Sequence, residues 1–401
     1  MIDRILVTGT GIVTGLGIGK NKTLEALLAE KSNIAQSRYL QTVHKELPVS
    51  EVHLTNEQMY QLLGIEEDEL YTRTALLGRI ALREALQEAN ILENPPKRIA
   101  FISGTTVGGM DKSEQYYKDF LSNDTKNQYI SVHDCGATTD LIAKEYKGVF
   151  DIITTISTAC SSAANAVILG ANLIKTNRVD VAIVGGSECL SKFHFNGFNT
   201  LMILDKQPCR PFDKTRAGLN LGEGAAFIVI ESEKSAKERQ IAPICQLSGY
   251  ANTCDAYHQT ASSPNGEGAF LAMKKALKQS GLQPKDIDYI NAHGTGTQNN
   301  DETEGIAIMR IFEENIPYIS STKSFTGHTT SAAGSVESVI SILALQHNFV
   351  PANLNFSQQM DELSFAPQYQ TNTDKKLKHV LTNSFGFGGN DTSCVFSVIS
   401  P

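Results

Sequence analysis

The sequence lacks the cysteine patterns that mark a disulfide framework or a zinc site. It contains seven cysteines, an odd number at irregular spacing, and no two of them form a Cys-x-x-Cys pair. Disulfide scaffolds and zinc sites both need paired thiols at regular spacing. We therefore expect reduced cysteines, which are typical of a cytosolic compartment.

Basic residues are not in excess, and no N-terminal leader pattern is visible. The chain has 35 Lys and Arg against 43 Asp and Glu, so its formal net charge is −8 at pH 7. Binding to nucleic acid needs a basic face that neutralises phosphates, and no basic cluster occurs. Residues Met1–Arg4 lead directly into the apolar Ile5–Val7, without a basic region or a leader-length apolar run. These features predict a cytoplasmic protein with no nucleic-acid partner.

Two further absences concern membranes and nucleotides. One uncharged stretch, residues 152–174, has the length of a membrane span, but polar residues interrupt it and it divides into a strand pattern and a helix pattern. Near the N-terminus, Gly9 and Gly11 match the first glycines of a dinucleotide fingerprint, but Thr14 occupies the third glycine position. In a P-loop reading of the same region, Asn21 stands where Ser or Thr would bind magnesium. We expect neither a membrane span nor a nucleotide site.

What the chain does contain is a regular alternation of short β-rich runs with longer helical patterns. Its 401 residues, 41% hydrophobic and 19% charged, are enough for two core-forming units of a globular protein. This alternation predicts an α/β fold with buried, mostly parallel sheets. The two halves have similar numbers of strands, which indicates an internal repeat with its break near residues 232–245. The expected strands are Ile5–Thr8, Ile99–Ser103, Ile152–Thr155, Val181–Val184, Ala226–Glu231, Gln246–Tyr250, Ile287–Ala292, Tyr318–Ser320, Val380–Asn383 and Ser393–Val398.

Cys160 lies where one of these strand patterns gives way to a helix. The apolar positions Ala164, Val167, Ile168 and Ala171 follow helical spacing, so Cys160 falls at or near the first turn. Free backbone N–H groups and the helix dipole stabilise a thiolate there and favour nucleophilicity. A buried cysteine is more often inert, so this position alone does not decide the role of Cys160.

Two histidines in glycine-rich loops strengthen the case for catalysis. His293 follows the strand pattern directly, in a turn of two glycines and two threonines, and His328 precedes a helix pattern after Lys323-Ser324-Phe325-Thr326-Gly327. Backbone-permissive neighbours allow a side chain to project into a cleft. Either histidine by itself is more often structural, but the two together with Cys160 favour a catalytic constellation.

A third signal is the segment Asn383-Ser384-Phe385-Gly386-Phe387-Gly388-Gly389-Asn390-Asp391. Its glycines allow backbone N–H groups to approach a substrate, and Phe385 and Phe387 are suited to cover an apolar tunnel. The simpler interpretation is a tight hairpin between the last two strands.

At this point the chain resembles the β-ketoacyl-acyl carrier protein synthases of the condensing-enzyme family, in particular the type II fatty-acid elongation enzymes. The matching segments span nearly the whole chain in order. They are Val7-Thr8-Gly9-Thr10-Gly11, the Cys160 loop, Arg210-Pro211-Phe212-Asp213, Gly222-Glu223-Gly224-Ala225-Ala226, Asp255-Ala256-Tyr257-His258, the two histidine motifs and the Phe-Gly-Phe-Gly-Gly segment.

The resemblance implies a thiolase-like α/β fold, in which two similar halves form a five-layered α-β-α-β-α sandwich. Residues 1–240 would form the half that carries the nucleophilic Cys160, and residues 241–401 the half that carries His293 and His328. Members of the family usually form homodimers, and a heterodimer with a ketosynthase-like partner is the other possibility.

The chemistry implied is a decarboxylating Claisen condensation. Cys160 would accept an acyl chain from a carrier-protein thioester, which is covalent catalysis. Malonyl-carrier protein would then lose carbon dioxide, and the resulting enolate would attack the acyl-Cys carbonyl. His293 and His328 would stabilise the negative charge on the malonyl thioester oxygen, and the N–H groups of Cys160 and Phe387 would meet the oxyanion of acyl transfer.

The resemblance also assigns supporting residues. Lys323 would bias the electrostatics and pair with Glu304. No cofactor or metal is required, because the substrates are carried on the phosphopantetheine of acyl carrier protein. The substrate-side positions implied are Val107 in the acyl pocket, Thr295 and Thr297 as hydrogen-bond partners of the phosphopantetheine arm, Phe387 as the gate, and Phe385, His258 and Glu304. Separately, Asn291, Glu337 and Asn383 match a structural cation site of some relatives.

Three departures from the elongation enzymes bear on the pathway. Asn390-Asp391 stands where Thr-Asn is common, the region around residues 36–60 is shortened, and Glu66–Glu69 is acidic where carrier-docking residues are usually basic. Docking would then use other residues, such as Arg73, Arg79, Lys206 or Arg210, or a dedicated carrier protein. These features are more typical of specialised ketosynthases, such as those of aryl polyene or flexirubin-type pigments, although fatty-acid elongation stays open.

Two other functions compete with this interpretation. A papain-like cysteine hydrolase has a similar spacing from Cys160 to His293, but its local cysteine signature is missing and His328 stays unexplained. A noncatalytic chain-length partner of a ketosynthase heterodimer typically lacks the reactive cysteine, which this chain retains.

Overall fold

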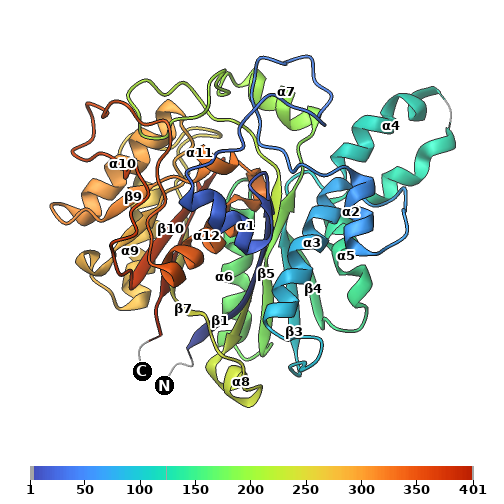
Figure 1. Ribbon diagram of the computed structural model, residues 1–401, viewed down its shortest axis with the longest axis horizontal. Helices are drawn as coiled ribbons and strands as arrows, with labels where there is room; N and C mark the ends of the chain where they lie inside the picture. The colour runs from blue at the N-terminus through green and yellow to red at the C-terminus, as the bar shows by residue number, and fades with distance from the viewer. Residues whose placement is uncertain (1–3, 123, 400–401) are drawn as a thin grey trace.

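The strands of the chain join into one 11-stranded sheet with the order β4-β3-β5-β6-β1-β7-β11-β10-β8-β9, and β2 pairs with β1. This computed structural model describes residues 4–122 and 124–399 (Figure 1). Residues 1–3, on which the expected absence of a leader partly depends, lie outside the described residues, as do 123, 400 and 401. The strands are β1 (Ile5–Thr14), β2 (Gly17–Ile18), β3 (Ile99–Gly104), β4 (Ile152–Ile156), β5 (Val181–Glu188), β6 (Gly224–Ser232), β7 (Cys245–Cys254), β8 (Tyr289–Asn291), β9 (Tyr318–Ser320), β10 (His379–Gly386) and β11 (Asn390–Ser397).

Helices separate most of these strands along the chain. The α-helices are α1 (Gly19–Leu28), α2 (Asn56–Leu63), α3 (Arg73–Glu88), α4 (Met110–Ser122), α5 (Cys135–Ala143), α6 (Ser162–Lys175), α7 (Lys192–Thr200), α8 (Glu233–Glu238), α9 (Glu267–Ser280), α10 (Gln298–Phe312), α11 (Lys323–Thr326) and α12 (Ala333–His347). Four short 3-10 helices are η1 (Asp124–Val132), η2 (Lys144–Tyr146), η3 (Pro284–Asp286) and η4 (Thr330–Ala332). Within the described part of the chain, no helix combines the length and the apolarity that crossing a bilayer requires.

The two halves of the sheet repeat the same arrangement of strands. The order β4-β3-β5-β6-β1 of the first half corresponds position by position to β9-β8-β10-β11-β7 of the second. The corresponding pairs also run in the same relative directions, parallel for β3–β4 and β8–β9 and antiparallel for β5–β6 and β10–β11. A short ladder between β1 and β7 joins the two halves at Leu6–Gln246 and Val7–Cys245. The predicted similarity of the two halves is therefore confirmed.

The expectation of mostly parallel sheets is wrong. In each half the strand next to the edge, β3 or β8, pairs parallel with both of its neighbours. The remaining pairs of each half are antiparallel. Helices cover both faces of each half-sheet, so strands such as β3, β5 and β6 are buried along nearly their whole length, whichever way their neighbours run. The apolar pattern of the strands therefore indicated that they are buried, but it did not indicate whether neighbouring strands run parallel or antiparallel.

Five layers alternate through the molecule (Figure 1). Helices α6 and α12 lie between the two half-sheets and share one core with both. Helices α3 and α5 cover the outer face of the first half-sheet, and α9 and α10 cover that of the second. The side chains of α12 are buried from Ala333 to Leu345, which is expected of a helix that is apolar all round and lies in the central layer.

The glycines of the N-terminal segment serve packing. Strand β1 extends beyond the expected Ile5–Thr8 to Thr14, so Gly9 and Gly11 lie in a strand and not in a phosphate-binding turn. A Cβ atom at Gly11 would lie 2.0 Å from the Ala81 carbonyl oxygen of α3, and one at Gly9 would lie 2.5 Å from that of Ala85. Only glycine lets this strand approach the helix so closely.

Candidate active site

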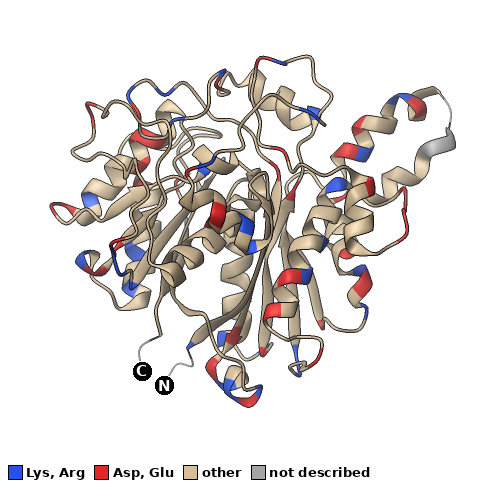
Figure 2. Cartoon of the chain, viewed as in Figure 1, with Lys and Arg blue, Asp and Glu red and all other residues tan. Residues whose placement is uncertain are grey.

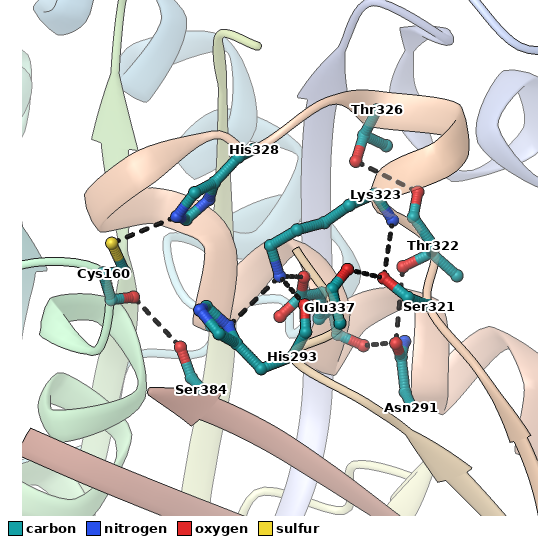
Figure 3. A network of polar contacts seen from close by, with 12 residues as sticks. Cys160, Asn291, His293, Ser321, Thr322, Lys323, Thr326, His328, Glu337 and Ser384 are labelled. Atoms are coloured by element: carbon teal, nitrogen blue, oxygen red, sulfur yellow. Dashed lines mark hydrogen bonds and ion pairs between the residues drawn. The ribbon is translucent and has the colours of Figure 1, made fainter. Parts of the chain in front are cut away.

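Cys160 lies in the loop between β4 and α6, two residues before the helix begins at Ser162. The preceding residue, Ala159, has a left-handed backbone with φ of 52°, which turns the chain sharply between strand and helix. The Ser384 hydroxyl of β10 donates to the Cys160 carbonyl oxygen at 3.0 Å. The cysteine is therefore presented by a tight elbow that a strand of the other half holds in place (Figure 3).

The structure brings both predicted histidines to this cysteine. The Nε2 atom of His328 lies 3.1 Å from Cys160 Sγ. The His293 ring lies beside that of His328, with centroids 5.4 Å apart and planes at 85°. All three side chains are buried, although they come from three distant segments of the chain.

Lys323 fixes the proton position on His293. Its Nζ donates to the His293 carbonyl oxygen at 2.6 Å and contacts His293 Nδ1 at 3.2 Å. A lysine ammonium only donates, so Nδ1 accepts and the ring proton resides on Nε2. The predicted pairing of Lys323 with Glu304 is wrong, because the lysine forms a buried ion pair with Glu337 of α12.

Glu304 instead holds the backbone of the His293 loop. Its two carboxylate oxygens accept the N–H groups of His293 at 2.9 Å and Gly294 at 2.8 Å. The Asn383 amide donates to the same carboxylate at 3.0 Å. Glu304 therefore positions the His293 loop, whereas the Lys323 ammonium pairs with Glu337.

His328 lacks such a constraint. Its Nδ1 atom is buried and has no hydrogen-bond partner among the described residues. No contact therefore selects one tautomer, so Nε2 is able either to accept a proton or to donate one. The two histidines differ in this respect, since Lys323 commits His293 Nε2 to donation.

The resting site is uncharged at the cysteine and both histidines. Burial raises the pKa of the Cys160 thiol to about 12, and the Lys323 charge and the N–H groups of Cys160 and Phe387 oppose this without outweighing it. Burial, with a further contribution from Lys323, also lowers the pKa values of His293 and His328 well below their usual range. The expected thiolate is therefore not the resting form, because loss of solvation exceeds the effect of the helix terminus.

The Phe-Gly segment forms the turn between β10 and β11, as its simpler interpretation also predicted. The Phe387 ring stacks on Phe198 of α7 with centroids 5.9 Å apart, and Phe385 lies 5.7 Å from the His293 ring. Gly388 and Gly389 have φ values of 84° and 76°, a conformation that favours glycine. The turn is thus a glycine hinge beside Cys160 that carries one aromatic ring.

A cavity of about 420 Å³ leads from the surface to this site. Of the residues predicted on the substrate side, Thr295, Thr297, Phe385 and Phe387 line it together with Cys160 and both histidines. The hydroxyls of Thr295 and Thr297 lie 2.9 Å apart. Three others do not line it: Val107 precedes α4, His258 accepts from the N–H groups of Thr260 and Ala261 in a surface loop, and Glu304 lies beneath the His293 backbone.

The residues proposed for a structural cation are engaged with one another and with their neighbours. Asn291 donates to the Glu337 carbonyl oxygen at 3.3 Å, and Asn383 Oδ1 accepts from Ser393 at 2.7 Å. Of the Glu337 carboxylate, one oxygen pairs with Lys323 and only Oε2 is unpartnered. The cation site that the resemblance implies also uses the backbone of Thr382 and Asn383, and it stays a prediction. The described part of the chain holds no cluster of three acidic, His or Cys side chains suited to a metal.

The prediction that Arg73 and Arg79 dock a carrier protein is wrong. Arg73 pairs with buried Glu223, and Arg79 is itself buried and pairs with Glu145. Arg210 pairs with Asp205 at 3.2 Å, whereas Lys206 is exposed. Lys and Arg are interspersed with Asp and Glu over the face shown in Figure 2.

Comparison with known proteins identifies the family. The model of the β-ketoacyl synthase N-terminal domain matches residues 3–236, and that of the C-terminal domain matches residues 244–357. The chain belongs to the β-ketoacyl synthase family. This ketosynthase is 32% identical to 3-oxoacyl-[acyl-carrier-protein] synthase 2 of Coxiella burnetii, with 98% of each chain covered.

Solved ketosynthase structures match this family member over its whole length. The ishigamide ketosynthase/chain length factor has a TM-score of 0.92 and 27% identity, with 100% of both chains covered. The complex of the ketosynthase ApeO with its chain length factor ApeC from Xenorhabdus doucetiae contains a chain with a TM-score of 0.83 and 31% identity, with 99% of this chain and 98% of that chain covered. The predicted thiolase-like fold is confirmed by these matches, and a condensing activity is the family's chemistry.

Some contacts at the site had no signal in the sequence. Phe198, Ser384 and Asn390 each contact the turn or the cysteine loop, but none lies in a pattern that names its partner. Phe198 is one of several aromatic residues of α7, and only the packing of α7 against the β10–β11 turn distinguishes it.

Proposed function

We propose that this chain is the catalytic β-ketoacyl-acyl carrier protein synthase of its pathway, with Cys160 as the acylated nucleophile. The observation that carries the proposal is the contact of 3.1 Å between Cys160 Sγ and His328 Nε2, with His293 alongside. A noncatalytic chain-length partner has no use for this arrangement, and the family match argues against a papain-like hydrolase.

In acyl transfer, Cys160 Sγ attacks the carbonyl carbon of an acyl thioester. The thiol proton moves toward His328 Nε2, and the oxyanion is met by the N–H groups of Cys160 and Phe387, both of which face the sulfur. When the tetrahedral adduct collapses, the carbon–sulfur bond to pantetheine breaks and the leaving thiolate takes the proton. His328 is suited to this exchange because no contact fixes its tautomer.

In condensation, the malonyl carbon–carbon bond breaks, carbon dioxide leaves and the electron pair becomes an enolate. His293 Nε2–H, whose proton Lys323 keeps in place, donates to the developing oxyanion. His328 donates beside it in its Nε2–H tautomer, which forms after acylation because Nδ1 has no partner that holds its proton. The enolate carbon attacks the acyl-Cys160 carbonyl, a carbon–carbon bond forms and the thioester breaks. The released Cys160 thiolate then takes up a proton, and no metal or cofactor enters the balance.

The substrates arrive on an acyl carrier protein, as in the relatives whose names include that carrier. The cavity lined by Thr295 and Thr297 is the proposed channel for the phosphopantetheine arm. Seven free cysteines fit a reducing compartment, and we place the reaction in the cytoplasm.

For the pathway we favour a specialised ketosynthase of the aryl polyene type over fatty-acid elongation. A chain of the ApeO–ApeC complex and the 3-oxoacyl-[acyl-carrier-protein] synthase 2 of Coxiella burnetii are 31% and 32% identical to this chain, so sequence identity alone does not choose the pathway. The stacked rings of Phe198 and Phe387 beside Cys160 suit a planar, conjugated acyl chain.

The partner we propose is a second copy of this chain. Strand β4 lies at the free edge of the sheet, where its backbone is open to pairing with another strand. Nearby, α4 and η1 extend from the body of the molecule (Figure 1) and expose Tyr117, Leu121 and Ile130. Light scattering of the purified chain tests this, since a monomer would point to a different, ketosynthase-like partner, as ApeO has in its complex.

The decisive experiment is intact-mass spectrometry after incubation with acyl carrier proteins that carry short saturated or polyunsaturated chains. The wild-type protein should gain one acyl group, and Cys160→Ala should gain none because the only proposed nucleophile is missing. An adduct that persists in the variant would refute the assignment of Cys160. Acylation by saturated chains alone, with none by polyunsaturated chains, would overturn the pigment pathway and leave the condensing mechanism intact.

A further inference from the structure

The turn that carries Phe387 is attached to the cysteine loop on both sides. Before the turn, Ser384 donates to the Cys160 carbonyl oxygen at 3.0 Å. Gly386 packs so closely that a Cβ atom there would lie 2.8 Å from the Thr158 carbonyl oxygen. Between the two attachments lie the hinge glycines Gly388 and Gly389, with φ values of 84° and 76°. The two glycines give the turn backbone freedom next to the Phe387 ring, while contacts on both sides of them hold the turn against the cysteine loop.

Asn390 forms the anchor after the turn. Its side-chain oxygen lies 2.9 Å from Ser161 Oγ, 2.7 Å from Asn165 Nδ2 and 2.7 Å from Asn252 Nδ2. Ser161 directly follows Cys160, Asn165 lies in the first turn of α6, and Asn252 lies on β7. One amide oxygen thus joins the turn to the cysteine loop, to the helix behind that loop and to the neighbouring strand.

A count of donors and acceptors shows that this cluster is satisfied. A carbonyl oxygen has two lone pairs, which the amide hydrogens of Asn165 and Asn252 fill. The Ser161 hydroxyl has one proton and a second acceptor, the Thr158 carbonyl oxygen at 2.8 Å. Ser161 is therefore able to exchange between Asn390 and Thr158 without leaving a group unpaired.

We propose that Asn390 is a positioning residue that keeps the Phe387 N–H aimed at the acyl carbonyl on Cys160 while the Phe387 ring moves. The inference rests on the proposed function and deepens it. Asn390 does not line the cavity, so it acts through the turn and not on the substrate. Threonine, the residue common at this position in the elongation enzymes that the chain resembles, has a shorter side chain and would not span the gap to Asn165 and Asn252.

The test separates oxyanion stabilisation from thiol reactivity. Asn390→Ala should slow single-turnover acylation by an acyl carrier protein about tenfold, because loss of a complete oxyanion donor costs roughly 10²–10³ and here the donor is only loosened. Alkylation of Cys160 by iodoacetamide should stay within about twofold of wild type, since it needs no oxyanion donor. Asn390→Asp keeps the acceptor oxygen and should restore most of the acylation rate.

Asn252→Ala is the matched control, because it removes a partner of the same oxygen without touching the cysteine loop, and acylation should change little. Asn165→Ala should slow acylation, and its effect should not add to that of Asn390→Ala in the double variant. Acylation of Asn390→Ala within twofold of wild type, or parallel loss of acylation and alkylation, would overturn the proposal. Neither result affects the assignment of Cys160, which the wild-type adduct decides.

Discussion

Asp391 carries a buried carboxyl group that the fold should keep protonated near neutral pH. Its side chain lies on β11 and is 3% exposed, and no hydrogen bond to the carboxyl group occurs among the described residues. A Cβ atom at Gly268 would lie 1.9 Å from Asp391 Oδ2 and 2.9 Å from Asp255 Cβ, so two acidic side chains meet at the start of α9. Burial, reinforced by the charges of Asp255 and Glu304, raises the pKa of Asp391 to about 7.

This pKa makes the free energy of unfolding depend on pH. In the unfolded chain the carboxyl ionises near its model value of 3.8, whereas the folded protein retains the proton until about pH 7. The folded state therefore binds more protons between these values, and stability falls as pH rises through that window. At about 1.4 kcal/mol per pKa unit, the full difference corresponds to about 4 kcal/mol, as an upper bound.

Asp391→Asn removes the ionisation and keeps the shape. We expect the variant to be more stable than wild type by no more than about 1 kcal/mol at pH 4.5 and by about 2–4 kcal/mol at pH 8. Urea unfolding followed by circular dichroism at pH 4.5, 6, 7 and 8 measures the difference. Asp361→Asn is the control, because the Asp361 side chain is 74% exposed and should show no comparable pH dependence. A stability difference that stays constant across pH, or a variant less stable than wild type at pH 8, would refute the reasoning.

Two further predictions concern Lys323 and His328. Lys323→Met should lower the free energy of unfolding by roughly 3–5 kcal/mol, because it leaves Glu337 buried and unpaired. The double variant with Glu337→Met should recover much of this loss, as measured by urea unfolding. If stability is not recovered, loss of the ion pair is not the cause. His328→Ala should slow both steps: acylation of Cys160, because the acceptor of the thiol proton is lost, and malonyl decarboxylation by roughly 10²–10³, because an oxyanion donor is lost. Carbon dioxide release and intact-mass acylation measure the two steps, and an unchanged rate in either would contradict the role proposed for His328 in that step.

The local patterns of the sequence located most of the elements and the main site residues. Apolar runs such as Val181–Val184 and Tyr318–Ser320 proved to be strands, because a buried strand needs a short stretch of apolar residues wherever it lies in the sheet. Cys160, His293 and His328 stood out because each occupies a junction or a glycine-rich loop at the end of an element. These features depend on residues close together in the chain, which is why the sequence alone was enough.

Contacts between distant segments could not be predicted in this way. Glu304 and Glu337 are both near Lys323 in the sequence. Only the packing of α12 against the lysine selects Glu337 as its partner. Arg73 and Arg79 look like surface cations in the sequence, but α3 packs them against the body of the protein. The direction of the strands was likewise decided by chain topology, since burial on both faces gives the same apolar pattern in either direction.

The sequence by itself therefore determined which residues are chemically able to act, and the tertiary structure decided in what form they act. A cysteine beside a helix terminus suggested a thiolate, but five packed layers remove water from Cys160 and raise its pKa. The same burial keeps His293 and His328 neutral, and Lys323 assigns the proton of His293. Solvation and the choice of partner are properties of the assembled layers, because they depend on every element that surrounds the site.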